Sequence, residues 1–178
     1  MKKVLSIALS LLVLFTSVSA LAENVITFDA AIAEQMGLQG EFVAMEDFGL
    51  QFYLPGPLSA LEVTQEQADQ GTYALFSTAD GTSSMSIGYA AATDAQGSEV
   101  TDLEELAALY SQAGAVNVET GEINGLPCIS YTFSEPGAMG VAFLTEKGHQ
   151  LTFNFSPLSD ESYQAVAMLV VSSIMPLE

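Results

Sequence analysis

Residues 116–155 form a run in which apolar and polar side chains alternate, and this run constrains the fold more than any other part of the sequence. Strict period-2 alternation of β-branched and aromatic residues is typical of half-buried β-strands. Asn124–Gly125 suits a two-residue type I′ turn, whose two central residues both need positive φ angles. Gly137 with Gly140, and Lys147–Gly148, interrupt the run twice more. The pattern predicts four strands in an antiparallel meander with one apolar face, formed by Ile129, Tyr131, Phe133, Val141, Phe143, Leu151, Phe153 and Phe155.

Residues 1–22 have the three parts of a secretory signal peptide. Lys2 and Lys3 give a positive start, residues 4–18 are mostly apolar and small, and residues 20–22 (Ala-Leu-Ala) supply an A-x-A cleavage site. We expect cleavage after Ala22 and a secreted, extracytoplasmic protein of bacterial type. An uncleaved N-terminal anchor is the alternative, although the apolar run is shorter than the roughly 18 uninterrupted residues of a membrane span.

The sequence is strongly acidic. It holds 22 Asp and Glu residues against three basic ones, with a formal net charge of −19 at pH 7, and Lys147 is the one cation after the signal segment. Such a surface repels nucleic acid and anionic lipid, because both need cationic groups to offset phosphate charge. We therefore expect no nucleic-acid partner and, after signal cleavage, no membrane partner. Such a charge is typical of a secreted protein that an acidic surface keeps in solution. It also suits the binding of divalent cations or of a basic partner.

The segment before the meander has several further signals. Residues 23–40 form an N-terminal leader. Either Asp29 caps a short helix that runs through Gln35, or the whole leader is only loosely docked on the domain. Residues 41–178 indicate a single domain, since they contain no repeat, linker or low-complexity run. We expect hairpins at 42–54 and 72–91, and one or two helical turns at 64–70.

Two longer helices complete the predicted fold. A capping box at residues 101–104 begins an amphipathic helix that ends near Gly114. Ser159 is expected to cap a last helix that Pro176 ends, with a buried stripe formed by Tyr163, Val166, Ala167, Val170 and Ile174. Antiparallel hairpins with two amphipathic helices place the chain in the α+β class, as an antiparallel meander with helices packed on it.

The order of elements, together with four local phrases, resembles the PsbP-like superfamily. The phrases are FGLQFYLP at 48–55, EINGLP at 122–127, FLTEKGH at 143–149, and LSDESY at 158–163 followed by SI at 173–174. The resemblance covers roughly residues 42–175. It implies an α-β-α sandwich without catalysis, which docks on larger assemblies. The photosynthetic members dock through basic residues, and this chain has only Lys147 for such a role, so no binding residue is carried over.

Few residues in the chain suit catalysis. Cys128 is the single cysteine and lies in a strand pattern, so we expect a small buried residue rather than a reactive thiol, which needs an electropositive neighbour. His149, the single histidine, lies beside a glycine turn and is expected to be exposed. A Cys128–His149 nucleophile and base remains a third and distant hypothesis, as part of a thiol or hydrolytic enzyme.

The leading hypothesis is therefore a secreted, non-enzymatic binding or assembly module with an unknown protein or cell-surface partner and no cofactor. The alternative is an acidic protein that binds divalent cations, calcium above all, since calcium prefers clustered carboxylate oxygens. The metal candidates are Asp94, Glu99 and Asp102. The partner-binding candidates are Phe48, Tyr53 and Tyr73, aromatic residues at strand ends or beside turns.

Overall fold

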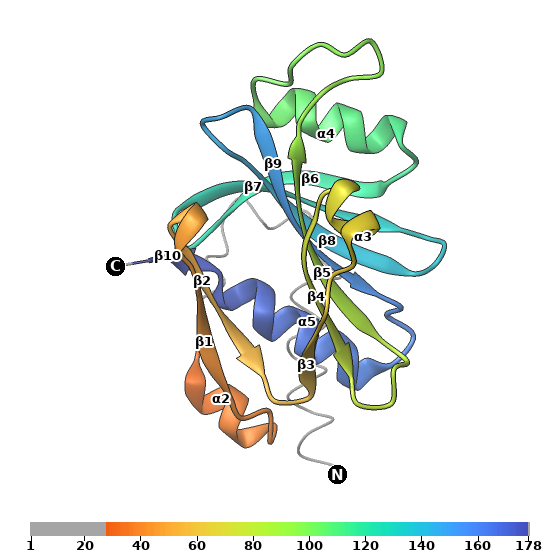
Figure 1. Ribbon diagram of the computed structural model, residues 1–178. Helices are drawn as coiled ribbons and strands as arrows, with labels where there is room; N and C mark the ends of the chain where they lie inside the picture. Colours follow the sequence, from red (N-terminus) through yellow and green to blue (C-terminus); the bar gives the residue numbers. More distant parts are fainter. Residues whose placement is uncertain (1–27, 178) are drawn as a thin grey trace.

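The computed structural model describes residues 28–177 (Figure 1). Its helices are α2 (Ala30–Gln35), α3 (Gln65–Asp69), α4 (Leu103–Gln112) and α5 (Glu161–Ser173), with a 3₁₀ turn η2 (Glu46–Phe48). Its strands are β1 (Gly40–Met45), β2 (Leu50–Pro55), β3 (Leu58–Leu61), β4 (Thr72–Thr78), β5 (Ser84–Ala91), β6 (Val116–Ile123), β7 (Leu126–Phe133), β8 (Ala138–Leu144), β9 (His149–Ser156) and β10 (Met175–Pro176). The predicted signal segment and its cleavage site lie outside the described residues. No helix within residues 28–177 has the length and apolar character needed to cross a membrane.

The strands of residues 28–177 form two antiparallel sheets, which confirms the α+β class. The large sheet has the order β3-β4-β5-β9-β8-β7-β6, and it contains all four predicted meander strands. Strand β9 pairs with β5, with Ile87 opposite Phe153, and so joins the meander to the β4–β5 hairpin. The small sheet, β1-β2-β10, combines the predicted β1–β2 hairpin with the end of the chain, where Met175 lies opposite Gln51. The short strand β3 had no clear signal in the sequence.

The prediction of one apolar face for the meander is wrong, because its strands present apolar residues on both faces. Val141 and Phe143 of β8 lie opposite Phe153 and Leu151 of β9, and these residues belong to the main hydrophobic core. Ile129, Tyr131 and Phe133 of β7 belong to a second core under α4, together with Leu106 and Ala142. Alternation along one strand shows that the two faces of that strand differ. Only the register between paired strands shows which faces of neighbouring strands lie on the same side of the sheet.

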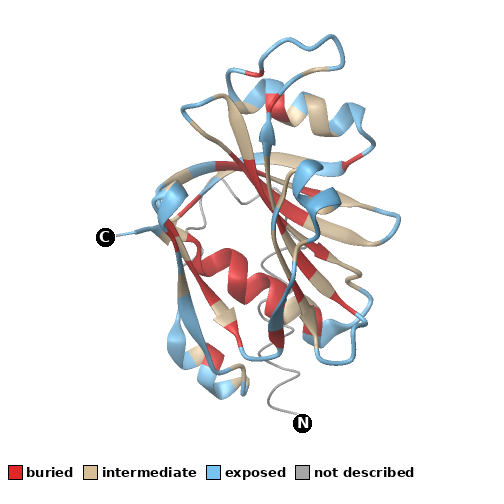
Figure 2. Cartoon of the chain, viewed as in Figure 1, coloured by how far each residue is buried: buried red, intermediate tan, exposed pale blue. Residues whose placement is uncertain are grey.

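Helix α5 packs against β2 of the small sheet and is buried over most of its length (Figure 2). All five residues of its predicted stripe are buried, and so are Met168, Leu169 and Val171. Leu169 forms a third cluster with Tyr53 of β2 and Ala33 of α2, so the predicted leader helix packs against the small sheet. Residues of α5, of the small sheet and of the large sheet share the main core, so α5 and the small sheet lie on one face of the large sheet, and α4 covers part of the opposite face.

Both long helices begin one residue later than the sequence predicts. Asp102, not Thr101, caps α4 by accepting from the Glu105 backbone N–H at 2.8 Å, and the Glu105 carboxylate reaches back to the Thr101 N–H at 2.9 Å. Asp160, not Ser159, caps α5 through the Ser162 N–H at 2.7 Å. In each pair the carboxylate takes the cap because a charged acceptor forms the stronger hydrogen bond. Helix α5 also ends at Ser173, before Pro176, which lies in β10.

The β6–β7 turn follows the prediction and has a second role. Asn124 and Gly125 both have positive φ angles, +48° and +84°, as a type I′ turn requires. The Asn124 side-chain nitrogen donates to the carbonyl oxygens of Ser172 at 2.9 Å and Ile174 at 2.8 Å. The turn therefore holds the C-terminal end of α5, where helix carbonyls lack intrahelical partners.

Candidate functional site

Four rings from four elements form a continuous row on the surface where the two sheets approach, and we call them the aromatic row. Phe48 of η2 packs edge-on against Tyr73 of β4, with centroids 4.9 Å apart, and against Tyr89 of β5 at 4.8 Å. Tyr89 stacks on His149 of β9 at 4.9 Å with an angle of 18° between the rings. Tyr89 and His149 meet because β5 pairs with β9, with Ala91 opposite His149.

The aromatic row is partly open to solvent. Tyr73 is 42% exposed, and its hydroxyl donates to the Asp47 carboxylate at 3.1 Å. Partial burial, followed by the hydrogen bond and negative charge of Asp47, raises the pKa of Tyr73, so the phenol remains a neutral donor at physiological pH. Phe48 and Tyr89 are half-buried against the main core. His149 is half-buried too, and its Nδ1 lies 2.9 Å from the Lys147 carbonyl oxygen, which can only accept.

The three predicted partner-binding aromatics do not lie together. The structure brings Phe48 and Tyr73 into contact, but it places Tyr53 in the third cluster, where it is 9% exposed. The Tyr53 hydroxyl donates to the Leu38 carbonyl oxygen at 3.3 Å. Tyr53 therefore has a packing role. Sequence reasoning missed Tyr89, which lies within the hairpin predicted at 72–91. It also missed His149, for which the position beside a turn was the one available signal.

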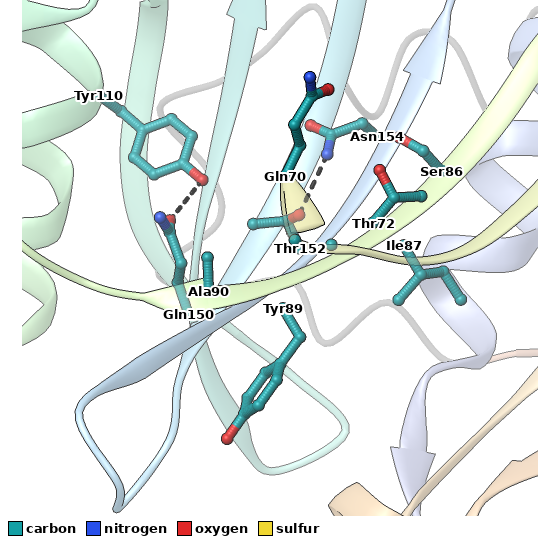
Figure 3. Close-up of a pocket in the computed structure, with 12 residues that line it drawn as sticks. Gln70, Thr72, Ser86, Ile87, Tyr89, Ala90, Tyr110, Gln150, Thr152 and Asn154 are labelled. Atoms are coloured by element: carbon teal, nitrogen blue, oxygen red, sulfur yellow. Dashed lines mark hydrogen bonds between the residues drawn. The ribbon is translucent and has the colours of Figure 1, made fainter. Parts of the chain in front are cut away.

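On the other face of β5 lies a pocket of about 260 Å³, between the end of α3, strands β5 and β9, and α4 (Figure 3). Cross-strand pairs line it, because Ser86 lies opposite Asn154, Gly88 opposite Thr152, and Ala90 opposite Gln150. Alternation of side chains along β5 sends Tyr89 to the opposite face, as Figure 3 shows. The sequence signal for this pocket was the small and amide residues that alternate with apolar residues along β5 and β9. That signal did not reveal that the two strands pair and so bring these residues together.

A hydrogen-bond network fixes one wall of the pocket. The Tyr110 hydroxyl of α4 donates to Gln150 Oε1 at 2.8 Å, and Asn154 donates to Thr152 Oγ1 at 3.1 Å. The hydroxyl of Tyr131, which lies under α4, donates to Asn154 Oδ1. Burial is the main cause that raises the pKa values of Tyr110 and Tyr131, so both phenols stay protonated at physiological pH.

Gly88 keeps the floor of the pocket open. A Cβ atom at this position would lie 2.7 Å from Thr152 Oγ1, closer than such atoms approach without a shift of the neighbour. A residue with a side chain would therefore fill the floor or displace Thr152. The close approach of the β5 backbone to Thr152 of β9 therefore explains why a residue without a side chain occupies this position.

The structure separates Cys128 from His149. Cys128 lies on β7 in the main core and is 3% exposed, as predicted. Strand β8 lies between β7 and β9, which places the two strands about 10 Å apart. Within the described part of the chain, no hydrogen bond joins the two side chains. The prediction that His149 is exposed is wrong, because its ring is half-buried against Tyr89.

The Cys128 thiol is expected to react very slowly in the folded protein. Burial, with a smaller effect from the negative charge of Glu122, raises the pKa of Cys128 from 9.0 to about 12. The thiolate population at neutral pH falls about a thousandfold as a result. Labelling with a thiol reagent should be slow in the native state and fast in denaturant. A Ser98→Cys variant, which adds a thiol in an exposed loop, should label rapidly without denaturant, and equally rapid labelling of native Cys128 would contradict its burial.

Two of the three metal candidates, Asp94 and Asp102, accept hydrogen bonds from backbone N–H groups. Asp94 accepts from the backbone N–H groups of Gln96 at 2.9 Å and Ser98 at 2.7 Å, and Asp102 caps α4. The Glu99 carboxylate lies against the backbone of Gly148, because a Cβ atom at Gly148 would meet it at 1.9 Å. Residues 28–177 contain no group of three or more His, Cys, Asp or Glu side chains arranged to hold a metal ion.

Comparison with known proteins gives similarity in structure but none in sequence. No protein-family model matches the chain, and no curated protein matches it significantly. The solution structure of cyanobacterial PsbP from Synechocystis matches with a TM-score of 0.53 and 13% identity, over 76% of this chain and 91% of that one. A Bacteroides thetaiotaomicron crystal structure matches with a TM-score of 0.48 and 16% identity, over 79% and 50%. The Saccharomyces cerevisiae Ran-binding protein Mog1p matches with a TM-score of 0.41 and 11% identity, over 79% and 97%.

The PsbP match confirms the fold that the sequence resemblance implied. It covers most of both chains, while its low identity carries no information about a shared activity. This chain has the PsbP-like fold.

Proposed function

We propose that this protein is an exported, non-enzymatic binding module that docks a basic segment of a protein or cell-surface partner on the aromatic row. The observation that carries the proposal is the contact of four rings, partly open to solvent, with a carboxylate at one end. Aromatic residues are the commonest anchors of protein interfaces. Phe48 and Tyr89 also pack against the main core, so these two rings are held in place before a partner binds.

Charge favours a basic partner. The chain has a formal net charge of −19, and Glu46 and Asp47 directly precede Phe48 in η2. A Lys or Arg side chain over an aromatic face is attracted by the ring, and a nearby carboxylate adds to the attraction. The long-range field of an acidic protein also speeds the encounter with a basic partner.

The non-enzymatic part of the proposal rests on the arrangement of the reactive groups. The Cys128 thiol is buried with a raised pKa, and His149 lies on another strand. A nucleophile and its base must lie within hydrogen-bond reach, and these two do not. Turnover of a peptide, ester or glycoside substrate by the purified protein would overturn this part.

Peptide display tests the docking surface. Peptides selected on the wild-type protein and counter-selected on a Tyr73→Ala variant are expected to be enriched in Lys and Arg. Their affinity should fall about two- to thirtyfold in the variant, the range of a single cation–π contact. The melting temperature should hardly change, because Tyr73 is an exposed residue.

Phe42→Ala is the matched control, since Phe42 is 45% exposed and lies outside the aromatic row. Its affinity for the selected peptides should equal that of the wild type. Selection of uncharged or acidic peptides, or an equal loss of affinity in both variants, would argue against docking on the row. Measurements at physiological salt keep the nonspecific attraction of the acidic surface screened beyond about 8 Å.

A further inference from the structure

We propose that the pocket between α3, α4, β5 and β9 binds a single neutral saccharide ring. Tyr89 lines the pocket and also belongs to the aromatic row, but its ring points to the opposite face of the large sheet, away from the pocket (Figure 3). The proposal therefore stands or falls independently of docking by a basic partner.

The absence of charge in the lining selects a neutral ligand. None of the residues that line the pocket is acidic or basic, in a chain that carries 22 acidic residues. An anion would meet no cationic group there and would be repelled by the overall charge. A cation would find no carboxylate in the lining to replace its water.

The lining has hydrogen-bonding capacity that its own contacts do not use. The side chains of Gln70, Thr72 and Ser86 make no hydrogen bond to another described residue, and the Gln150 nitrogen remains available while its oxygen accepts from Tyr110. Amides and hydroxyls both donate and accept, as the hydroxyl groups of a sugar do. An apolar ligand would leave these groups without partners, at a cost for each.

The shape suits one ring. A volume of about 260 Å³ lies just below the roughly 300–1,000 Å³ of pockets for drug-sized ligands. The Tyr110 ring forms a side wall, against which the C–H face of a sugar can pack. The pocket lies on the face of the sheet rather than at its edge, so a peptide cannot bind there by adding a strand.

Titration with single sugars, followed by NMR, tests the proposal. D-glucose, D-galactose and N-acetyl-D-glucosamine are the neutral probes, with D-galacturonate as the anionic and D-glucosamine as the cationic analogue. At least one neutral sugar should bind with about millimolar affinity, as expected for a ligand of few atoms. The Gly71 and Gly88 amide signals should shift, and the charged analogues should bind at least about tenfold more weakly. If a disaccharide of the same sugar binds more tightly than the single sugar, the natural ligand is the end of a glycan. If the two bind with equal affinity, the natural ligand is a free sugar.

Two substitutions locate the binding site. Thr72→Val and Ser86→Ala each remove one hydroxyl and should weaken sugar binding about three- to tenfold, the effect of one lost hydrogen bond. Thr120→Val makes the same change as Thr72→Val on exposed β6, and should leave the affinity unchanged. Three results would overturn the proposal: no binding of any neutral sugar at about 50 mM, well above the expected affinity; equal binding of the charged analogues; or unchanged affinity in both pocket variants.

Discussion

Replacing Phe52 with Ala is expected to lower the free energy of unfolding by about 3–5 kcal/mol, the usual cost of truncating a buried phenylalanine. Phe52 is 1% exposed and lies on β2 of the small sheet. Its ring packs edge-on against Phe153 at 5.5 Å and Phe76 at 6.2 Å, both in the large sheet. The substitution therefore removes a direct packing contact between the two sheets. A loss of this size is a large part of the roughly 5–15 kcal/mol that stabilises a typical domain.

Denaturation by urea, followed by circular dichroism, measures this effect. Phe52→Leu is the matched control, because it keeps most of the apolar volume and should cost far less than the truncation. If the sheets lose their coupling in Phe52→Ala, the small sheet should unfold first and the transition should broaden. A loss under about 1 kcal/mol would show that Phe52 is not fully packed between the sheets.

Asn124→Asp is expected to lower the free energy of unfolding by about 2–4 kcal/mol at pH 7, although the two side chains have nearly the same shape. The amide nitrogen donates to the carbonyl oxygens of Ser172 and Ile174. A carboxylate has no hydrogen to donate, so both carbonyls lose a partner. It also brings a negative charge to the C-terminal end of α5, where the helix dipole is already negative.

The pH dependence of this variant distinguishes charge from lost hydrogen bonds. Nearby carbonyl oxygens favour the protonated acid, so the pKa of the introduced carboxyl should be higher in the folded than in the unfolded state. The destabilisation should therefore be full above the folded pKa and decrease as the pH falls through it, since the protonated acid can donate to one carbonyl. Asn124→Gly keeps the positive φ angle and removes only the hydrogen bonds, so its cost should be smaller and independent of pH. An equal cost for both variants would leave no role for charge.

The partner surface shows how far local reasoning reached. Phe48 and Tyr73 follow from the sequence as aromatic residues near turns, but nothing local shows that they touch. Their contact depends on the small sheet lying against the large one, and Tyr89 and His149 join them only because β5 pairs with β9. Tyr53 has the same local signal as Phe48, yet α2 and α5 cover it.

The sequence by itself determined the elements whose signals are local. Alternation of side chains and glycine turns defined β4 to β9, and Asn124–Gly125 defined a turn with two positive φ angles. These patterns are readable because the backbone period and the φ requirement act within a few residues. The α+β class follows from them.

Tertiary structure alone decided which strands pair and which faces coincide. Ile87 and Phe153 become neighbours across 65 intervening residues, and alternation in either strand is compatible with other partners and with either face of the sheet. The same pairing joins Ser86, Gly88 and Ala90 to Asn154, Thr152 and Gln150, and so forms the pocket. Hydrogen bonds between backbones are the same for every sequence, so the choice among pairings depends on how the buried side chains pack together in three dimensions.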